Sequence, residues 1–387
     1  MNDKRLLILG GYGNTGRLIA GLLLQESNVR LVVAGRNRAR AERLAHELNE
    51  EYLGSRVRAA YADASLPDTL HNALEGIDML VVASATAEFS RQVAETALQA
   101  GVDYLDVIYS RKKLRILREL EAQIESSGRL FISDGGFHPG LPAALIRFAA
   151  PEFDRLQEAR VGSVIKIDWS GLQFSPSTMR EFAAEFMDFQ TIAYENGAWQ
   201  NVSMMGMMKP QSMEFGPPFG RQYAIPMFIE EMRAIPDLYP GLRETGFYVG
   251  GFNPVSDWLV TPLVMGCLKI APQKGLAPMG RLFTWSLRTF SRPPYGTKLK
   301  LEARGLKGGL WRAIDFTVEH DDGYFLTAVP VVACLRQYLD GAFTQAGLHF
   351  QAHIVEPKRF LRDIARMGVI VKQEESSPKG KKVTKFV

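Results

Sequence analysis

Cysteine is scarce in this sequence, and its scarcity excludes two classes of protein. The 387 residues include only Cys267 and Cys334, which are far apart and have no histidine or further cysteine nearby at metal-ligand spacing. Neither a disulfide framework nor a zinc site is indicated. We therefore expect no bound metal and a reducing, cytoplasmic location.

An excess of charge of one sign is also lacking. The chain has 46 basic and 42 acidic residues, and its formal net charge is only +4. Nucleic-acid-binding proteins concentrate basic residues on one face, so the near balance of charge argues against a nucleic-acid partner.

Long apolar runs are missing as well. The longest, residues 258–270, is interrupted by Thr261, Pro262 and Lys269 and is too short to span a bilayer. We interpret it as a buried helix, with peripheral membrane contact as the alternative. The N-terminal residues do not form an apolar segment followed by small residues, so no signal peptide is expected.

The sequence does contain a regular alternation of short apolar runs with amphipathic stretches. This alternation predicts an α/β fold, a doubly wound parallel sheet with crossover helices. The strands are expected at residues 5–10, 29–34, 56–61, 77–83, 103–107 and 129–133.

After Phe137 the alternation stops, and the sequence indicates an inserted α+β domain. Residues 298–304 and 312–319 alternate polar and apolar side chains and predict a hairpin. The expected division is a nucleotide domain over 1–138, a substrate and dimerisation domain over 139–330, returning helices over 331–372 and a disordered tail over 373–387. A homodimer is expected.

A glycine-rich motif follows the first predicted strand. Gly11, Gly13 and Gly16 form a G-x-G-x-x-G pattern that also contains Asn14 and Thr15. Such a motif needs a tight turn at its first glycine, close approach of a pyrophosphate at its second and close packing of the helix at its third. The alternative is a glycine-rich turn that binds nothing, but the surrounding strand pattern favours dinucleotide binding.

The end of the second strand indicates which dinucleotide is bound. NAD-preferring proteins usually place an acidic residue there, whereas this sequence has Arg36, with Asn37 and Arg38 beside it. A guanidinium can bind a 2′-phosphate through two hydrogen bonds, so the sequence predicts NADP(H) rather than NAD(H). The alternative is that Arg36 begins a solvated helix.

Three further residues are predicted to line the cofactor. Asp63 follows the third strand and could accept a hydrogen bond from the adenine amino group, or it could cap a helix or turn. Ala83 and Ser84 end the fourth strand, at the carboxyl edge where nucleotides bind in this type of sheet.

Taken together, the segments at 8–13, 33–36, 100–106 and 136–141 give the sequence a resemblance to the saccharopine dehydrogenase-like reductases, which include saccharopine reductase and carboxynorspermidine dehydrogenase. The resemblance implies a Rossmann domain, an inserted domain, terminal helices that return to the Rossmann domain and a substrate cleft between the domains. The family's amino-acid reductases usually carry Asp before the Pro-Gly of the last segment. This sequence departs from the family by having His138 there.

The resemblance implies an NADP(H)-dependent oxidoreductase that transfers hydride to or from a C=N bond of an opine or amino-acid type substrate. His138 is the candidate catalytic residue, because it follows the sixth strand and imidazole titrates near neutral pH. Alternatively, it is a structural loop histidine.

Two other functions stay open. The second domain is rich in apolar side chains, which suits an apolar lipid-like enone or carbonyl as well as it suits a core or subunit interface. These side chains include Phe182, Phe186, Phe189, Met204, Met205, Met207 and Met208. The remaining alternative is a nonenzymatic NADP(H)-binding regulator.

Overall fold

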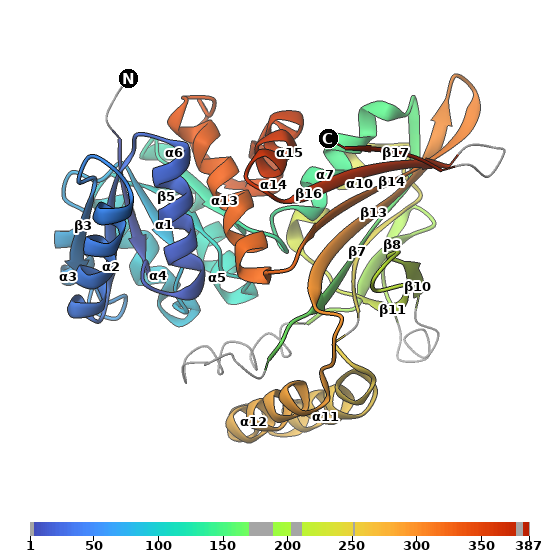
Figure 1. The fold of residues 1–387 in the computed structure, drawn as a ribbon, viewed down its shortest axis with the longest axis horizontal. Coiled ribbons are helices and arrows are strands. Elements are labelled where there is room, and N and C mark those ends of the chain that lie inside the picture. Colours follow the sequence, from blue (N-terminus) through green and yellow to red (C-terminus); the bar gives the residue numbers. More distant parts are fainter. Residues whose placement is uncertain (1–3, 170–188, 203–210, 251, 377–381, 387) are drawn as a thin grey trace. The chain divides into compact units, whose positions relative to one another are not determined.

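The computed structural model describes residues 4–169, 189–202, 211–250, 252–376 and 382–386. The chain divides into two compact units (Figure 1). Unit 1 comprises Met1–Leu141 and Thr327–Glu356, and unit 2 comprises Pro142–Leu326 and Pro357–Val387.

Unit 1 is built on a parallel sheet with the strand order β15-β6-β5-β4-β1-β2-β3. Its strands are β1 (Arg5–Leu9), β2 (Arg30–Gly35), β3 (Val57–Tyr61), β4 (Met79–Val82), β5 (Asp103–Asp106), β6 (Leu130–Ser133) and β15 (Gly347–Phe350). All six predicted runs lie in this sheet, so the predicted α/β fold is confirmed. Strand order reverses between β1 and β4, which is where nucleotides bind in such folds.

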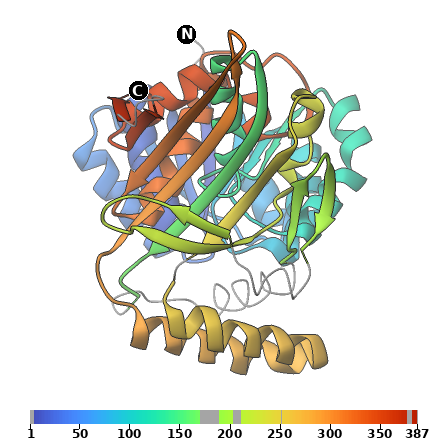
Figure 2. The same cartoon turned by 90° about the vertical axis from the view of Figure 1, so that its right-hand side faces the viewer.

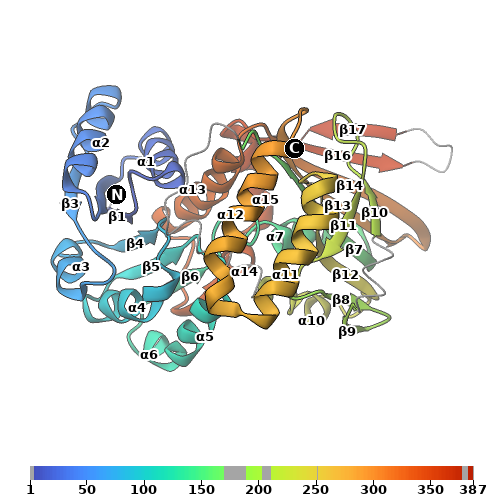
Figure 3. The same cartoon turned by 90° about the horizontal axis from the view of Figure 1, so that it is seen from below.

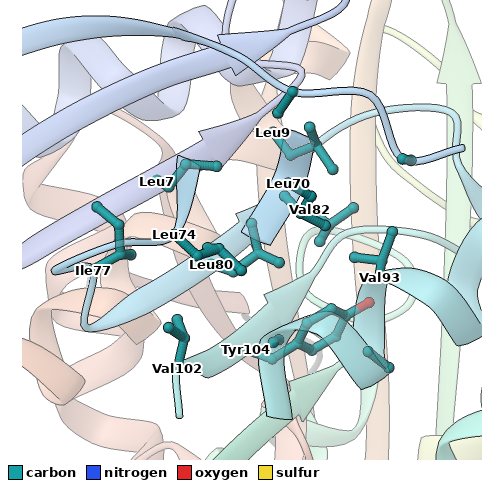
Figure 4. Packing of buried hydrophobic residues seen from close by; sticks show 14 of the residues in the cluster. Leu7, Leu9, Leu70, Leu74, Ile77, Leu80, Val82, Val93, Val102 and Tyr104 are labelled. Atoms are coloured by element: carbon teal, nitrogen blue, oxygen red, sulfur yellow. The ribbon is translucent and has the colours of Figure 1, made fainter. Parts of the chain in front are cut away.

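Helices connect these strands. They are α1 (Asn14–Glu26), α2 (Arg38–Glu51), α3 (Pro67–Ala73), η1 (Ala87–Phe89), α4 (Ser90–Gln99), α5 (Arg111–Glu119), α6 (Glu121–Ser126), α13 (Gly323–Leu339, which begins in unit 2) and α14 (Gln351–Ile354). Leu7, Leu9, Leu80 and Val82 pack with side chains of the helices in the core of this unit (Figure 4). Helices cover both faces of the sheet, which explains why the sequences of most strands are continuous apolar runs.

Unit 2 is built on a second, mixed sheet with the order β10-β11-β12-β7-β13-β14-β16-β17, in which only the described pair β12 and β7 is parallel. Its strands are β7 (Arg155–Lys166), β8 (Ile192–Glu195), β9 (Ala198–Asn201), β10 (Gln211–Glu214), β11 (Arg221–Pro226), β12 (Glu244–Gly250), β13 (Gly296–Lys307), β14 (Leu310–His320), β16 (Ile370–Ser376) and β17 (Lys382–Phe386). β13 and β14 form the predicted hairpin.

The helices of unit 2 are α7 (Pro142–Ala149), η2 (Ala150–Glu152), η3 (Glu230–Met232), α10 (Ile235–Leu238), α11 (Thr261–Ile270), α12 (Pro272–Phe290) and α15 (Pro357–Arg366), with a π-helical turn, η4 (Ser256–Val260), leading into α11. α11 and α12 lie side by side as a helical hairpin (Figures 2 and 3). Within the described residues, no helix has the length and apolar content needed to cross a membrane.

The C-terminal part of the chain differs from the prediction. Residues 370–376 pair with β14, and residues 382–386 pair with β16 in turn, so the prediction of a disordered tail from residue 373 is wrong for these strands. Arg312 forms an ion pair with Glu375, which helps to hold β16 in place. Charge and serine content favoured disorder, but pairing with β14 supplies hydrogen-bonding partners that the tail alone lacks.

The division into units also differs from the predicted boundaries. The insertion ends at Leu326 rather than at 330, and Pro357–Val387 belongs to unit 2. α15 contacts α7, and Phe360, Leu361 and Ile364 are buried. This helix therefore does not group with unit 1, in contrast to the predicted return of all the terminal helices.

One group of predicted residues cannot be placed. Phe182, Phe186 and the methionines Met204, Met205, Met207 and Met208 lie outside the described residues.

Candidate functional site

The glycine turn of unit 1 leaves no room for side chains at two positions. Gly10 has φ +84°, and a Cβ atom there would lie 2.6 Å from the Cβ of Ser84. A Cβ at Gly16 would lie 2.3 Å from the carbonyl oxygen of Gly10. The close helix packing predicted at Gly16 is therefore observed, whereas the left-handed residue of the turn is Gly10 instead of Gly11.

Gly13 is less confined. The nearest atom to a Cβ at this position would be the Gly10 oxygen at 3.1 Å, followed by the Ala83 oxygen at 4.0 Å. Gly13 is the N-cap of α1, makes no side-chain capping bond and has no acidic residue in the turn that follows. Within the described part of the chain, no acceptor is recorded for the backbone N–H groups of Asn14, Thr15 and Gly16. Such a helix start can bind a phosphate.

Arg36 follows β2 directly and is exposed. Among the described residues it has no hydrogen bond or ion pair, whereas Arg38 forms an ion pair with Glu42 at 2.8 Å. Arg36 therefore has a free guanidinium at the position that the sequence singled out.

Tyr12 connects the glycine turn to the end of β2. Its hydroxyl accepts a hydrogen bond from the Asn37 backbone N–H at 2.9 Å, and the Arg40 guanidinium lies 4.7 Å from the centre of its ring. Sequence reasoning missed Tyr12 and Arg40 as neighbours of the predicted site. The arginine-rich run after β2 was the available signal.

Two predicted cofactor residues have local structural roles. The Asn37 side chain accepts from the Arg40 backbone N–H at 3.0 Å and caps α2. Asp63 accepts from both the backbone N–H and the hydroxyl of Ser65, so the turn that the sequence left open as an alternative is present. Ala83 and Ser84 do lie beside the glycine turn, as the Cβ distances at Gly10 show.

A buried charged cluster lies at the carboxyl ends of β5 and β6. The Lys113 ammonium donates to Asp106 at 2.8 Å, to Asp134 at 2.5 Å and to the Ser133 hydroxyl at 2.8 Å. Lys113 and Asp106 are fully buried. Burial alone would lower the pKa of Lys113, but the two carboxylates raise it above its usual value, so the lysine stays charged.

His138 lies in a loop after β6, where Gly136 and Gly140 both accept hydrogen bonds from the Gln351 side chain. Its ring contacts the Phe137 ring at 4.4 Å between centroids. Burial lowers the pKa of His138 to about 4, so the imidazole is neutral at physiological pH. A neutral ring can donate or accept a hydrogen bond but does not carry the extra proton expected of a cationic acid.

The N-terminal part of the chain matches a known family. Residues 6–132 match the model of the saccharopine dehydrogenase NADP binding domain. This segment is therefore similar to that NADP-binding domain. The predicted resemblance is thus confirmed, and the glycine turn, Arg36 and β4 all fall within the matched residues.

Solved structures extend the similarity to the whole fold. Saccharopine dehydrogenase (L-Glu forming) from Saccharomyces cerevisiae is 14% identical over 97% of this chain and 100% of its own, with a TM-score of 0.67. A DAP dehydrogenase of C. glutamicum in complex with DAP is 14% identical over 95% of this chain and 99% of its own, with a TM-score of 0.48. No curated protein sequence matches the chain. The chain thus has a fold similar to that of the yeast saccharopine dehydrogenase.

Outside the NADP-binding domain, unit 2 contains a pocket of about 400 Å³. Its apolar lining includes Phe189, Tyr223, Ile225, Phe252, Trp258 and Met265. Lys166, Arg221 and Asp257 provide its charged groups. Within the described residues no cluster of histidine, cysteine and acidic side chains could hold a metal ion, so metal-ligand residues do not define this pocket.

Asp257 is a partly buried titratable group of the pocket. Burial raises its pKa to about 7, against the lowering effect of the backbone N–H groups of Phe252 and Asn253 and of Lys166. The carboxyl group is therefore partly protonated at neutral pH.

The raised pKa of Asp257 predicts a pH-dependent stability of unit 2. The folded state holds this proton more tightly than the unfolded state, so its stabilisation is complete below the unfolded pKa and decreases as the pH rises toward 7. The expected decrease is about 1.4 kcal/mol per pH unit at most. Urea unfolding at pH 5, 6 and 7, followed by tryptophan fluorescence, measures it.

An Asp257→Asn variant should lack this contribution, and its free energy of unfolding should change less over the same pH range. The matched control is Asp237→Asn, at an exposed position of the same unit. Parallel pH profiles for wild type and Asp257→Asn would contradict the assignment.

Proposed function

We propose that this chain is an NADP(H)-dependent oxidoreductase that transfers hydride to or from the C=N bond of an opine or amino-acid type substrate. The observation that carries the proposal is the uncapped start of α1 behind a glycine-rich turn, with the unpaired Arg36 at the end of the neighbouring β2. A dimer stays a prediction.

The residues of the turn fit a dinucleotide. Asn14, Thr15 and Gly16 offer backbone N–H groups at a helix N-terminus, which suits a pyrophosphate. The narrow space at Gly10 brings the turn close to the residues that follow β4, the narrow space at Gly16 brings α1 close to the turn, and the larger space at Gly13 allows a phosphate to approach the backbone. Arg36 would hold the 2′-phosphate. The nicotinamide, when bound, supplies or accepts the hydride.

His138 would act as a neutral hydrogen-bonding group in this reaction. Its pKa of about 4 makes protonated imidazole scarce at neutral pH. We therefore propose that it orients the substrate or passes on a proton through its neutral ring, and that it does not hold a stored proton before the reaction.

A second candidate substrate is an apolar enone or carbonyl compound. The largely apolar pocket of unit 2 favours it, because aromatic and aliphatic side chains and Met265 contribute to its lining. Carboxylate-bearing substrates need cations, and within the described lining these are Lys166 and Arg221.

A single assay distinguishes the candidate functions. NADPH oxidation is measured across pairs of 2-oxo acids with amines and across apolar enones, with NADH in parallel. Turnover of an imine-forming pair supports the first candidate, and turnover of an enone supports the second. Binding of NADPH without oxidation across the whole panel would favour the nonenzymatic regulator instead.

Arg36→Ala is expected to weaken NADPH binding roughly 10- to 150-fold, the range for a lost hydrogen bond between charged groups, and to leave NADH nearly unchanged. Calorimetric titration of both cofactors measures the difference. Arg38→Ala is the matched control, because Arg38 already forms an ion pair with Glu42. Equal weakening of both cofactors by Arg36→Ala would disprove the role of Arg36.

A further inference from the structure

η4, α11 and α12 form a hairpin whose first half is η4 with α11 and whose second half is α12. The outer face of the first half is apolar. Trp258, Leu259, Leu263 and Ile270 are 51%, 68%, 53% and 87% exposed. Their spacing places them on one side of the helix, together with the exposed Pro262 and Gly266. A continuous apolar stripe thus faces away from the rest of the hairpin.

The second half of the hairpin is basic on its exposed side. Lys274, Arg281 and Arg288 recur there at helical spacing, with Trp285 between them at 53% exposure. Lys269 and Arg292 add positive charge near the two ends of α11 and α12. The sequence from 258 to 294 contains no acidic residue.

The internal packing of the hairpin does not account for the outer stripe. Val260, Val264 and Leu268 of the first half pack against Phe283 and Leu287 of α12, and together with Trp169 they form a separate core. The opposite face contributes nothing to this core. Among the described residues, Leu259, Leu263 and Ile270 of the outer stripe therefore stay exposed.

We propose that this hairpin docks unit 2 on an anionic lipid surface. Leucine and isoleucine side chains would enter the acyl boundary, tryptophans would lie at the headgroup level, and the lysines and arginines would bind lipid phosphates. The lack of acidic residues from 258 to 294 favours an anionic surface over a mixed protein surface, and the acidic residue of η4, Asp257, lines the pocket instead. Because neither α11 nor α12 is long and apolar enough to cross a membrane, the hairpin would lie in the plane of the interface.

The hairpin that would dock on lipid also contributes to the unit 2 pocket. Trp258, Thr261 and Met265, from the first half of the hairpin, line part of the unit 2 pocket. An apolar substrate could therefore reach the pocket from the lipid. This use depends on the second candidate function, whereas the docking itself does not.

Vesicle co-sedimentation of the full chain tests the docking. We expect binding to vesicles of phosphatidylcholine containing one third phosphatidylserine, weaker binding to pure phosphatidylcholine, and loss of the difference at high salt. Leu263→Glu combined with Ile270→Glu should reduce binding roughly tenfold or more, because both residues would otherwise bury apolar surface. Leu53→Glu, at a 93% exposed position of unit 1, should leave binding unchanged.

A second variant tests the contribution of the positive charge of the hairpin to binding. Arg281→Gln combined with Arg288→Gln should remove most of the preference for phosphatidylserine, with circular dichroism confirming the fold. The proposal would be overturned if wild type bound both vesicle types equally. It would also be overturned if the variant with Leu263→Glu and Ile270→Glu bound as tightly as wild type. Sedimentation velocity showing a dimer that the same variant converts to monomer would overturn it too, since a second copy would then cover the face. NADPH oxidation measured without vesicles tests the proposed function separately.

Discussion

Replacing Lys113 by methionine is expected to cost unit 1 about 3–5 kcal/mol, the range for removing one partner of a buried ion pair. Lys113 is the cation for both Asp106 and Asp134, and all three groups are buried. Methionine has a similar length but donates no hydrogen bond, so both carboxyl groups would lose their charged partner.

The pH dependence of this loss separates it from a simple packing defect. Burial raises the pKa of Asp134, and Lys113 counteracts this rise, so without Lys113 the pKa should rise further and the variant should lose more stability than wild type as the pH increases. A cavity would cost the same at every pH. Wild type should show a smaller decline, because burial already raises the pKa of Asp134 while Lys113 works to lower it.

Hydrogen exchange of peptides covering β5 and β6 is the appropriate measurement, because the tryptophans all lie in unit 2 and do not report on unit 1. Lys112→Met is the matched control, since Lys112 is exposed and adjacent. Protection in Lys113→Met that equals protection in Lys112→Met would show that the ion pairs contribute little net stability.

The cluster of Lys113, Asp106, Ser133 and Asp134 was not predicted from the sequence. Its members come from the ends of β5 and β6 and from α5, and no local motif unites them. One signal was present, because Lys113 is in register with Ile116, Leu117 and Leu120 on the buried side of this region. A lysine on an apolar stripe indicates a buried partner, but the partner can be identified only from the fold.

The glycine turn and the positions of six strands were predictable because their signals are local. Apolar runs and glycine spacing are local properties, and each has a direct physical cause in a covered parallel strand or a close backbone approach. β15 was missed because Gly347–Phe350 is short and pairs with β6 from a distant part of the chain. Asn37 and Asp63 are polar residues that follow strands, as predicted. Their side chains already accept hydrogen bonds from nearby backbone N–H groups, which are local structural roles.

The helix at residues 258–270 was predicted as buried, and only one side of it is. Val260, Val264 and Leu268 are buried, as expected for an apolar run. Leu259 and Leu263 are exposed, because α12 packs against only one side of α11. Composition alone cannot distinguish these two sides, whereas the pairing of α11 with α12 does.

Gly13→Asp is expected to abolish measurable dinucleotide binding. A carboxylate at this position would occupy the space beside the start of α1 and would repel the pyrophosphate charge. At about 4 Å and an effective dielectric constant near 20, such repulsion amounts to about 4 kcal/mol, or roughly a thousandfold in affinity. Calorimetric titration with NADPH and with NADH measures it, and both cofactors should be affected because they share the pyrophosphate.

Two controls isolate the charge at Gly13. Gly13→Ala adds only a Cβ atom 3.1 Å from the Gly10 oxygen, so it should weaken binding far less than the aspartate. Gly21→Asp places the same charge further along α1, where the nearest atom to the new Cβ would be the Tyr52 hydroxyl at 3.5 Å, and it should bind NADPH nearly as wild type does. If Gly13→Asp keeps its fold by circular dichroism and still binds NADPH normally, the cofactor does not lie on this turn.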